Sequence, residues 1–283
     1  MKLKVKPIKA IVAALILLGL VSYGVYMQAT MEKSAEEATG ERVITIGGTP
    51  TSYPMLYMEG AEVKGSYVDF ANAIGEKAGY EIDWELGEWS GILASLQAGR
   101  IDSAANFAVT PEREEMYDFT DTILYSGVGI GVAEGNTDIE TFDDLKGKTV
   151  NSIVGTNYGK VVEDMDTDNE IMIEPLEDIN VAFNNVYQGK TDAVVFGYET
   201  LSALNKDRDA NIVILDEVFG VNEVAFPFVK TAENEELIAE WNQAIEELRA
   251  DGTLAEISEK WYGMDVTTSP EASADVEKYM IEK

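Results

Sequence analysis

One arginine stands where it could bind a carboxylate. Arg113 follows Thr110 and Pro111, and this order predicts a short helix with Thr110 as its N-cap and Arg113 in its first turn. Free backbone N–H groups at a helix start attract anions, and a planar guanidinium holds a carboxylate through two parallel hydrogen bonds. We therefore predict that Arg113 binds the acid group of a ligand. The alternative is an ion pair with Glu112, Glu114 or a nearby Asp on a solvated helix.

A second candidate for carboxylate binding is the turn formed by Gly155, Thr156 and Asn157. It follows a predicted strand and opens a predicted helix, so its N–H groups could meet a ligand from the side opposite Arg113. Considered alone, such a turn is more often an ordinary helix cap.

The composition removes much of the chemistry that a protein could perform. The chain has no Cys and no His, which excludes disulfides, thiol nucleophiles, His-based triads and zinc sites of the Cys/His type. Residues 164–169 partly match a calcium loop, but Gly is missing at the sixth place and Pro175 stands at the twelfth, where Glu is required. We expect no metal and no cofactor, and an enzyme would have to use Asp, Glu, Lys, Tyr, Ser or Thr.

The net charge restricts the partners. Asp and Glu number 52 against 21 Lys and Arg, which gives a formal charge of -31. A nucleic-acid partner is therefore not expected, because phosphate binding needs a basic surface, and anionic lipid headgroups would repel this chain. A ligand with zero or positive net charge, such as a zwitterion, is the best match for the negative electrostatic potential of this chain.

The N-terminus has the pattern of an export signal or a membrane anchor. Lysines precede an apolar run over residues 10–27, and the positive-inside rule then puts the rest of the chain outside the cytoplasm. The run is long for a signal core, and small-x-small cleavage sites are poor, which favours an uncleaved anchor over secretion after signal cleavage. Residues 30–41 are predicted to be a polar spacer.

After the spacer, strand-like and helix-like segments alternate. Alternating or continuous apolar residues predict strands at 43–46, 81–85, 149–154 and 192–196, and apolar residues at helical spacing predict a helix at 67–77. This order is typical of an α/β sheet.

Two features indicate two lobes. Residues 96–104 and 186–194 share a helix end, a Gly, a basic residue and an Asp that opens a strand. Residues 126–133 have Gly at every second position, so one face of this strand carries no side chains, as a strand that leaves one lobe for the other would need. Further strands are predicted at 212–215 and 224–229, and the second would return to the first lobe.

The longest predicted helix spans residues 235–250. Its apolar residues recur on one face, which predicts that Trp241 belongs to the core and not to a ligand cage. A further helix is expected at 254–262, and the chain from Asp265 onward is expected to be polar and loosely held.

Several motifs together resemble the extracellular solute-binding proteins, family 3, which serve polar amino-acid ABC importers. The match runs from Val43 to Thr267. The motifs are, in order, Gly65-x-x-Val-Asp-Phe70, Trp89-Ser-Gly-Ile92, Leu96-Gln-x-Gly-Arg-Ile-Asp102, Thr110-Pro-Glu-Arg113, Phe119-Thr-Asp121, Asp144-Leu-Lys-Gly-Lys-Thr-Val150, Gly155-Thr-Asn-Tyr158 and Ala250-Asp-Gly-Thr-Leu-x-x-Ile-Ser-Glu-Lys-Trp-Tyr-Gly263. The turn at Gly155 and the closing motif look most like the cystine-binding branch.

The resemblance implies a two-lobe α/β fold of the periplasmic-binding-protein type (type II), with two crossing strands and the ligand cleft between the lobes. It predicts an N-terminal signal or anchor and spacer at 1–41, lobe 1 at 42–125 plus 225–266, lobe 2 at 126–224, and a polar tail at 267–283.

The resemblance also implies roles for particular residues. Arg113 would clamp the ligand carboxylate, helped by N–H groups near Ala108 and at Thr156 and Asn157. Tyr53 would place an aromatic ring over the ligand side chain, and Trp89 and Phe107 would line the cleft.

Two positions depart from the family pattern. The family usually has a Ser or Thr hydroxyl at Ala108, and at Gly197 it usually has the Asp that pairs with the ligand's α-ammonium. A buried ammonium without a partner would cost on the order of a few kcal/mol. Either Glu199, Glu223 or Asn106 therefore replaces this Asp, or the ligand is not an ordinary α-amino acid.

The sequence therefore predicts an extracytoplasmic, monomeric receptor that captures a small carboxylate-bearing solute by hinge closure and presents it to an ABC permease. The ligand would be a polar amino acid or a cystine-like compound, and the protein would not be an enzyme. The alternative is an enzyme on the same fold that resembles cyclohexadienyl dehydratases, with Glu199 as general acid. A sensory domain is disfavoured, because no output module follows the anchor.

Overall fold

The computed structural model describes residues 42–208 and 212–269. The apolar run at 10–27, the spacer and most of the predicted tail lie outside these residues, so the predictions about them stay predictions. Within the described ranges, no helix is both long and apolar enough to cross a membrane.

The first α/β layer comes from the first half of the chain. Its elements are β1 (Arg42–Gly48), α2 (Ser66–Ala78), β5 (Tyr80–Leu86), α3 (Trp89–Gln97) and β6 (Ser103–Ala104). The three strands have the order β5-β1-β6, with β1 parallel to β6. Ile44 and Ile46 of β1 are buried, and α2 ends at Gly79 in the left-handed conformation, with φ 82°. The strands predicted at 43–46 and 81–85 and the helix predicted at 67–77 are confirmed.

A small antiparallel sheet lies beside this layer. It consists of β2 (Thr51–Ser52), β3 (Leu56–Glu59) and β4 (Glu62–Lys64), in this order. The sequence analysis did not predict it, because strands of two to four residues are too short to show an alternating pattern.

A second sheet has six strands in the order β11-β10-β12-β9-β13-β7. Its strands are β7 (Phe107–Ala108), β9 (Leu124–Ala133), β10 (Thr149–Ile153), β11 (Met172–Leu176), β12 (Ala193–Gly197) and β13 (Ile212–Ala225). β10 is parallel to both β11 and β12, whereas β9 is antiparallel to β12 and β13. Three helices of the second half pack on it, namely α5 (Tyr158–Met165), α6 (Ile179–Tyr187) and α7 (Tyr198–Arg208).

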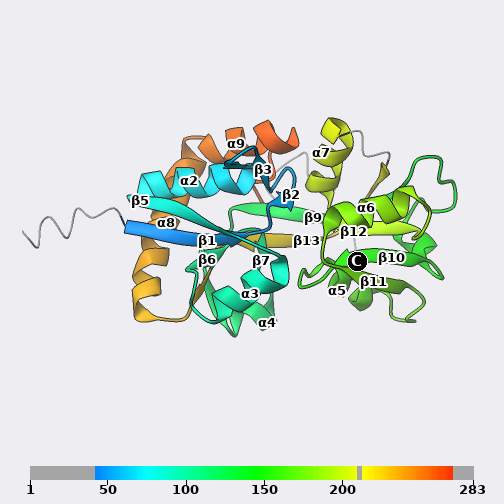
Figure 1. The fold of residues 1–283 in the computed structure, drawn as a ribbon, viewed down its shortest axis with the longest axis horizontal. Helices are drawn as coiled ribbons and strands as arrows, with labels where there is room; N and C mark the ends of the chain where they lie inside the picture. The colour runs from blue at the N-terminus through cyan, green and yellow to red at the C-terminus, as the bar shows by residue number, and fades with distance from the viewer. Residues whose placement is uncertain (1–41, 209–211, 270–283) are drawn as a thin grey trace, which may run out of the picture. The chain divides into compact units, whose positions relative to one another are not determined.

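The strands β9 and β13 connect the two parts of the fold. Near its C-terminal end β13 pairs with β7, while residues 128–132 of β9 pair with β12, and both strands run between the two α/β parts in Figure 1. A Cβ atom on Gly129 would lie 3.1 Å from Tyr198 Cα, and one on Gly131 would lie 3.0 Å from side-chain atoms of Val194 and Ile212. The bare face of β9 is therefore needed for close packing. The predicted two-lobe type II fold with two crossing strands is confirmed, while the exact lobe boundaries stay a prediction.

The segments 212–215 and 224–229 are strand as predicted, apart from Phe226, but the strand does not stop between them. β13 is continuous from Ile212 to Ala225, with register shifts against β9 on both sides of Val218. These bulges let the strand continue through a segment without regular alternation. The chain then leaves β13 at Phe226, whose N–H donates to Thr120 Oγ1 at 3.1 Å, and β14 (Pro227–Val229) pairs with β8 (Tyr117–Phe119).

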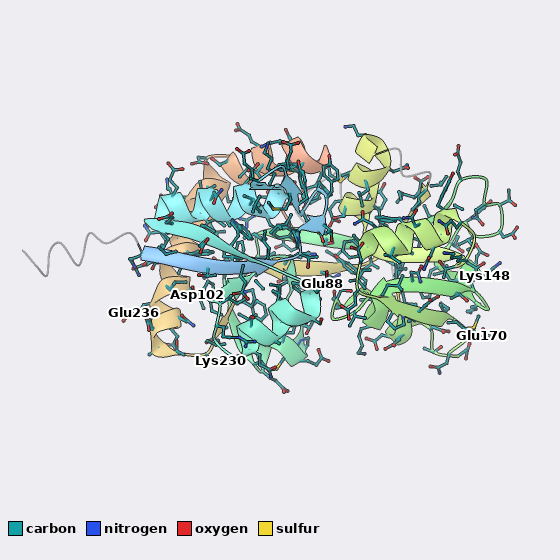
Figure 2. All side chains as sticks on the ribbon, viewed as in Figure 1. Glu88, Asp102, Lys148, Glu170, Lys230 and Glu236 are labelled. Atoms are coloured by element: carbon teal, nitrogen blue, oxygen red, sulfur yellow. The ribbon has the colours of Figure 1, made fainter. Side chains whose placement is uncertain are left out.

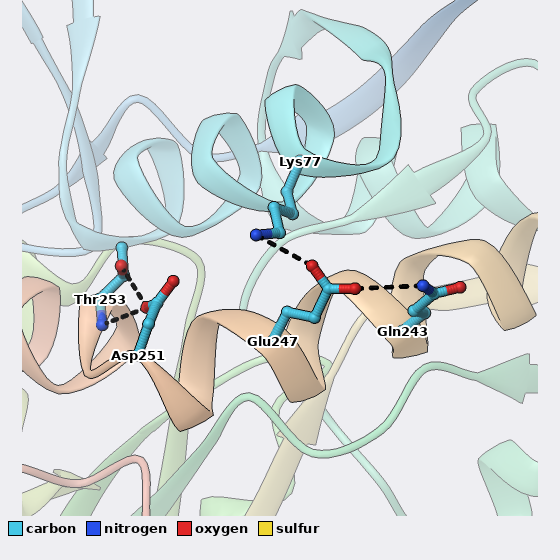
Figure 3. Close-up of polar contacts among 5 residues, drawn as sticks. All are labelled: Lys77, Gln243, Glu247, Asp251 and Thr253. Atoms are coloured by element: carbon cyan, nitrogen blue, oxygen red, sulfur yellow. Dashed lines mark hydrogen bonds and ion pairs between the residues drawn. The ribbon is translucent and has the colours of Figure 1, made fainter.

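The remaining helices are the short α4 (Pro111–Glu114), the 3-10 helix η1 (Phe142–Leu145), α8 (Ala232–Ala250) and α9 (Thr253–Tyr262). Glu247 of α8 pairs with Lys77 of α2 at 2.9 Å and accepts a hydrogen bond from Gln243 (Figure 3). Asp251 accepts hydrogen bonds from the backbone and side chain of Thr253 and so caps the start of α9 (Figure 3). Exposed polar contacts of this kind fix helix ends but contribute little free energy each.

Trp241 is a residue of α8, and its side chain lies in the hydrophobic core, as predicted. It is 0% exposed, and its ring contacts those of Tyr80, Phe226 and Phe228 at centroid distances of 6.4, 5.3 and 5.6 Å. The indole Nε1 has no hydrogen-bond partner among the described residues, so the contribution of this side chain is packing.

The expectation that the chain is loose from Asp265 onward was wrong at its first residues. Val266 and Thr267 are buried, and the Tyr125 N–H donates to the Val266 carbonyl at 2.8 Å. Arg249 also donates to the Thr267 carbonyl. The chain therefore stays packed beyond the last helix.

Charged side chains cover the outside of the fold (Figure 2). Lys148 and Glu170, labelled there, lie at the start of neighbouring strands, where the Met172 N–H donates to the Lys148 carbonyl at 2.9 Å. Lys230 forms an ion pair with Asp118 at 3.6 Å. The excess of acidic residues is thus a surface property, as the charge suggests.

Candidate functional site

A cavity that is partly open to solvent lies between the two parts of the fold, and the empty space in it, open solvent included, is about 540 Å³. Gly48 at the end of β1 and Ile153 at the end of β10 both line it, so it lies outside the carboxyl ends of strands, where α/β folds usually bind ligands. The polar and aromatic residues of its lining include Thr49, Ser52, Tyr67, Trp89, Asn106, Thr156 and Phe196.

Arg113 is positioned by the helix start that the sequence predicted. Thr110 is the N-cap of α4, and its hydroxyl accepts the Arg113 N–H at 3.3 Å. The guanidinium lies over the Phe107 ring at 4.2 Å and is largely withdrawn from water, which lowers the pKa of Arg113 from its ordinary value. The alternative of a solvated side chain paired with an acidic residue of its own helix does not describe this geometry.

The guanidinium of Arg113 also connects the two parts of the fold. Nη1 donates to the Ala108 carbonyl at 2.8 Å, and Nη2 donates to the Gly155 carbonyl at 2.7 Å. On another side of the cavity Thr51 Oγ1 donates to Asp178 Oδ2 at 3.3 Å, and Asn180 Nδ2 donates to the Thr51 carbonyl at 3.0 Å. The two parts therefore touch at both places, which is a closed arrangement.

Trp89 packs directly on Gly155. A Cβ atom on Gly155 would lie 2.9 Å from Trp89 Cδ1 and 3.0 Å from its Nε1, and Gly155 has φ 76°, which favours glycine. The Trp89 Nε1–H is buried and has no hydrogen-bond partner among the described residues. This N–H lies against Gly155, so in this arrangement the indole contributes packing between the two parts of the fold.

The turn after Gly155 is arranged differently from the prediction. The N–H and the hydroxyl of Thr156 both donate to the Ile153 carbonyl, at 3.1 and 2.7 Å. Asn157 is not among the residues that line the cavity, and its Nδ2 donates to Asn222 Oδ1 at 2.7 Å. Thr156 lines the cavity, but in this arrangement its N–H closes the turn and does not point freely at a ligand.

Asn106 and Tyr67 form one polar wall of the cavity. Asn106 has φ 55°, which is uncommon for a residue other than glycine, and its Oδ1 accepts the Tyr67 hydroxyl at 3.0 Å. Both residues line the cavity. The sequence analysis selected Asn106 but missed Tyr67, because an aromatic residue on the apolar face of a helix looks like a core residue.

Glu199 is buried behind the cavity wall, at the start of α7. It is 4% exposed, and its Oε1 accepts the Ser126 hydroxyl at 2.8 Å. Burial raises the pKa of Glu199 to about 7, and the hydrogen bond from Ser126 opposes this shift. Gly197 is the last residue of β12 and lies directly beside this carboxyl group.

Arg113 is not among the residues that line the cavity, and its guanidinium contacts Phe107, Ala108 and Gly155 instead. The other predicted site residues fall into three groups. Trp89, Asn106 and Thr156 line the cavity. Residues that support Arg113 or lie behind the wall are Phe107, Ala108, Gly197 and Glu199.

Tyr53 and Asn157 form the third group, which the structure does not bring to the cavity. The ring of Tyr53 packs on Tyr57 at 5.0 Å, and its neighbour Ser52 lines the cavity instead. Thr51 and Ser52 of β2 both line the cavity, and the chain turns away at Tyr53, so an error of one position in the register moves the assignment off the cavity. Their roles in binding remain predictions.

Residues 44–264 match the bacterial extracellular solute-binding proteins, family 3, and the chain belongs to this family. It is 38% identical over 228 residues to the probable amino-acid-binding protein YxeM of Bacillus subtilis (strain 168), covering 80% of this chain and 86% of that protein. It is 32% identical over 231 residues to the L-cystine-binding protein TcyJ of Escherichia coli (strain K12), covering 80% and 85%.

The fold is similar to solved structures of the same class. An ancestral arginine-binding protein bound to arginine has a TM-score of 0.71 and 30% identity, and the match covers 78% of this chain and 98% of that chain. The named relatives are binding proteins and not enzymes, which supports the prediction of a solute-binding protein. Family members are extracytoplasmic.

Proposed function

We propose that this protein captures a small amino acid outside the cytoplasm and delivers it to an ABC permease. The observation that carries this proposal is the position of Arg113, a partly desolvated guanidinium that bridges the two parts of the fold. One of its bonds goes to the carbonyl of Gly155, which directly precedes the cavity-lining Thr156. The similarity to amino-acid-binding and cystine-binding proteins supports an amino-acid ligand, with cystine or a related polar amino acid first.

Ligand capture is proposed to work by closure of the two lobes. In the ligand-free protein, open and closed forms exchange, and a ligand that contacts both lobes shifts the population towards the closed form. Arg113 would exchange its bond to the Gly155 carbonyl, or its bond to the Ala108 carbonyl, for the ligand carboxylate. A carboxylate is the better acceptor because it adds charge to the hydrogen bond.

The proposal includes attachment and assembly. The lysines and apolar run before residue 28 support a membrane anchor or an export signal, and the protein would act as a monomer beside its permease. The lobe boundaries at residues 125, 126, 224 and 225 belong to the same proposal, and they would lie within β9 and at the end of β13.

A thermal-shift panel tests this function. The purified full-length chain, kept in detergent, is heated with polar amino acids, L-cystine and dicarboxylates in turn. A true ligand at 100 times its Kd should stabilise the folded protein by about 2.7 kcal/mol, and native mass spectrometry should show one bound molecule. If no amino acid in the panel raises the melting temperature, the proposed function is wrong.

The enzyme alternative has one observation in its favour. A buried carboxyl group with a pKa raised to about 7, as Glu199 has, suits general acid catalysis. Incubation with prephenate or arogenate decides between the two functions. We expect no turnover. Product formation that depends on Glu199 would show that the protein is an enzyme and not a binding protein.

Gly155→Ala should weaken binding of the panel ligand about tenfold. A side chain there meets Trp89 and forces an L-residue into the left-handed conformation, which costs about 1–2 kcal/mol in the closed form. Gly147→Ala is the matched control, because Gly147 has φ 77° but nothing within 4 Å of its Cβ position. Titration calorimetry should show normal affinity for this control. Equal losses in both variants would mean that contact between Trp89 and Gly155 does not support closure.

A further inference from the structure

Glu199 is a buried carboxyl group that receives hydrogen bonds but no counter-charge from the described residues. Its Oε1 accepts the hydroxyl of Ser126 at 2.8 Å and that of Thr200 at 3.5 Å. No Lys or Arg in the described part of the chain is among the groups that influence its ionisation. A buried carboxylate without a cation is costly, so this site is incomplete when the carboxyl group is ionised.

Gly197 makes the space that this carboxyl group occupies. A Cβ atom on Gly197 would lie 2.4 Å from Glu199 Oε1 and 2.8 Å from Ser126 Oγ. Even alanine would therefore collide with both groups. The absence of a side chain at the end of β12 allows a carboxylate from the following helix to lie beside that strand end.

The groups that surround Glu199 are tyrosines from three other helices. Tyr67 of α2, Tyr158 of α5 and Tyr262 of α9 each interact electrostatically with it, and burial raises the pKa of all three phenols. Their hydroxyls are already hydrogen-bonded, to Asn106, Ser126 and Ser66 respectively. Two cationic side chains lie close to these tyrosines or their neighbours. Arg113 interacts with Tyr158, and Lys206 of α7 lies near Gly263, the residue after Tyr262. Around neutral pH only Glu199 can change its charge in this cluster.

The cluster borders the cavity. Tyr67 lines it, and so does Phe196, which directly precedes Gly197 and packs on the Tyr158 ring at 4.6 Å. Glu177 is the residue with a carboxyl group among those that line the cavity, and it is exposed to solvent. Glu199 lies behind the cavity wall, buried and without a counter-charge among the described residues.

We propose that Glu199 accepts the ammonium group of the ligand and loses a proton when the ligand binds. This inference rests on the proposed function and extends it, because it assigns the ligand to zwitterionic or cationic amines and couples binding to pH. Proton loss converts a neutral buried acid into the partner of a buried cation, so neither charge remains unpaired in the complex.

The sign of the pH dependence follows from this exchange. In the free protein Glu199 holds its proton up to about pH 7, whereas the bound ammonium favours the ionised form. Affinity should therefore fall about tenfold for each pH unit below 7 and level off above it. Near pH 6 binding should release about one proton, and near pH 8 almost none.

Titration calorimetry of the full-length wild type tests this coupling. The probe is L-cystine, or failing that the amino acid with the largest shift in the thermal panel, at pH 5.5 to 8 in buffers with different ionisation enthalpies. The dependence of the heat on the buffer gives the number of protons released. The matched probe 3,3′-dithiodipropionate, which is cystine without its ammonium groups, should bind weakly and release no proton.

Two variants identify the residue. Glu199→Gln should bind about 10- to 100-fold more weakly at pH 8 and show neither proton release nor pH dependence. In the double variant Gly197→Asp with Glu199→Ala, the new carboxylate starts from a Cβ that lies 2.4 Å from the present position of Oε1. It should restore affinity at pH 8. Circular dichroism and thermal melting confirm that each variant is folded.

The outcomes separate the two levels of the proposal. If no panel ligand binds the wild type, the proposed function itself fails. If a ligand binds with no proton release near pH 6, or if Glu199→Gln binds as tightly as the wild type, the function stands and the role of Glu199 is wrong.

Discussion

Arg113→Ala should reduce the affinity for the panel ligand by about 100-fold or more. Two charge-assisted hydrogen bonds to the ligand carboxylate are lost, each worth about 1.5–3 kcal/mol. The side chain also bridges Ala108 and Gly155 in the closed form, so this form loses support as well. Calorimetry on the purified protein measures the change.

Arg113→Lys is the matched control for this prediction. It retains the positive charge but loses the planar fork, and it should therefore bind with an affinity between those of wild type and Arg113→Ala. The melting temperature without ligand should change little in both variants, because α4 is a short helix at the surface with no buried residue. Unchanged affinity in a folded Arg113→Ala protein would refute the role of the guanidinium.

Trp241→Ala should destabilise the protein by about 3–5 kcal/mol, which is much of the stability of an ordinary domain. The indole is fully buried among Tyr80, Phe226 and Phe228, so its removal leaves a cavity where three rings now have a partner. Denaturant unfolding measures the loss as a lower midpoint.

Trp241→Phe separates packing from hydrogen bonding. The indole Nε1 has no partner among the described residues, so phenylalanine loses volume but no hydrogen bond, and the cost should be clearly smaller than that of alanine. Equal costs for Phe and Ala would show that the cavity explanation is incorrect.

Much of the fold could be predicted because its signals are local. The N-cap at Thr110 and the glycine that ends α2 both depend on a few adjacent residues, and both are present as expected. The alternating glycines of β9 predicted one bare strand face, and the structure shows side chains and backbone packed closely against that face.

The features that were missed depend on contacts between distant residues. β13 continues through Asp216 and Glu217 because its bulges restore pairing with β9, and no pattern within the strand shows this. In the site, the wall formed by Tyr67 and Asn106 depends on a contact between a helix and a turn 39 positions apart.

The hydrogen bonds between β9 and β13 have a mechanical consequence. The two connections between the lobes are neighbours in one sheet, paired from Leu124 with Val224 to Ala133 with Ile212. Because the two strands are paired, we expect them to bend together and to limit the relative motion of the lobes mainly to one rotation axis. The register shifts on both sides of Val218 interrupt the regular pairing and should make this pair of strands easier to bend there. Under the proposed function, ligand binding would then change mainly one angle between the lobes, and the permease would detect this change at the outer surfaces of the lobes.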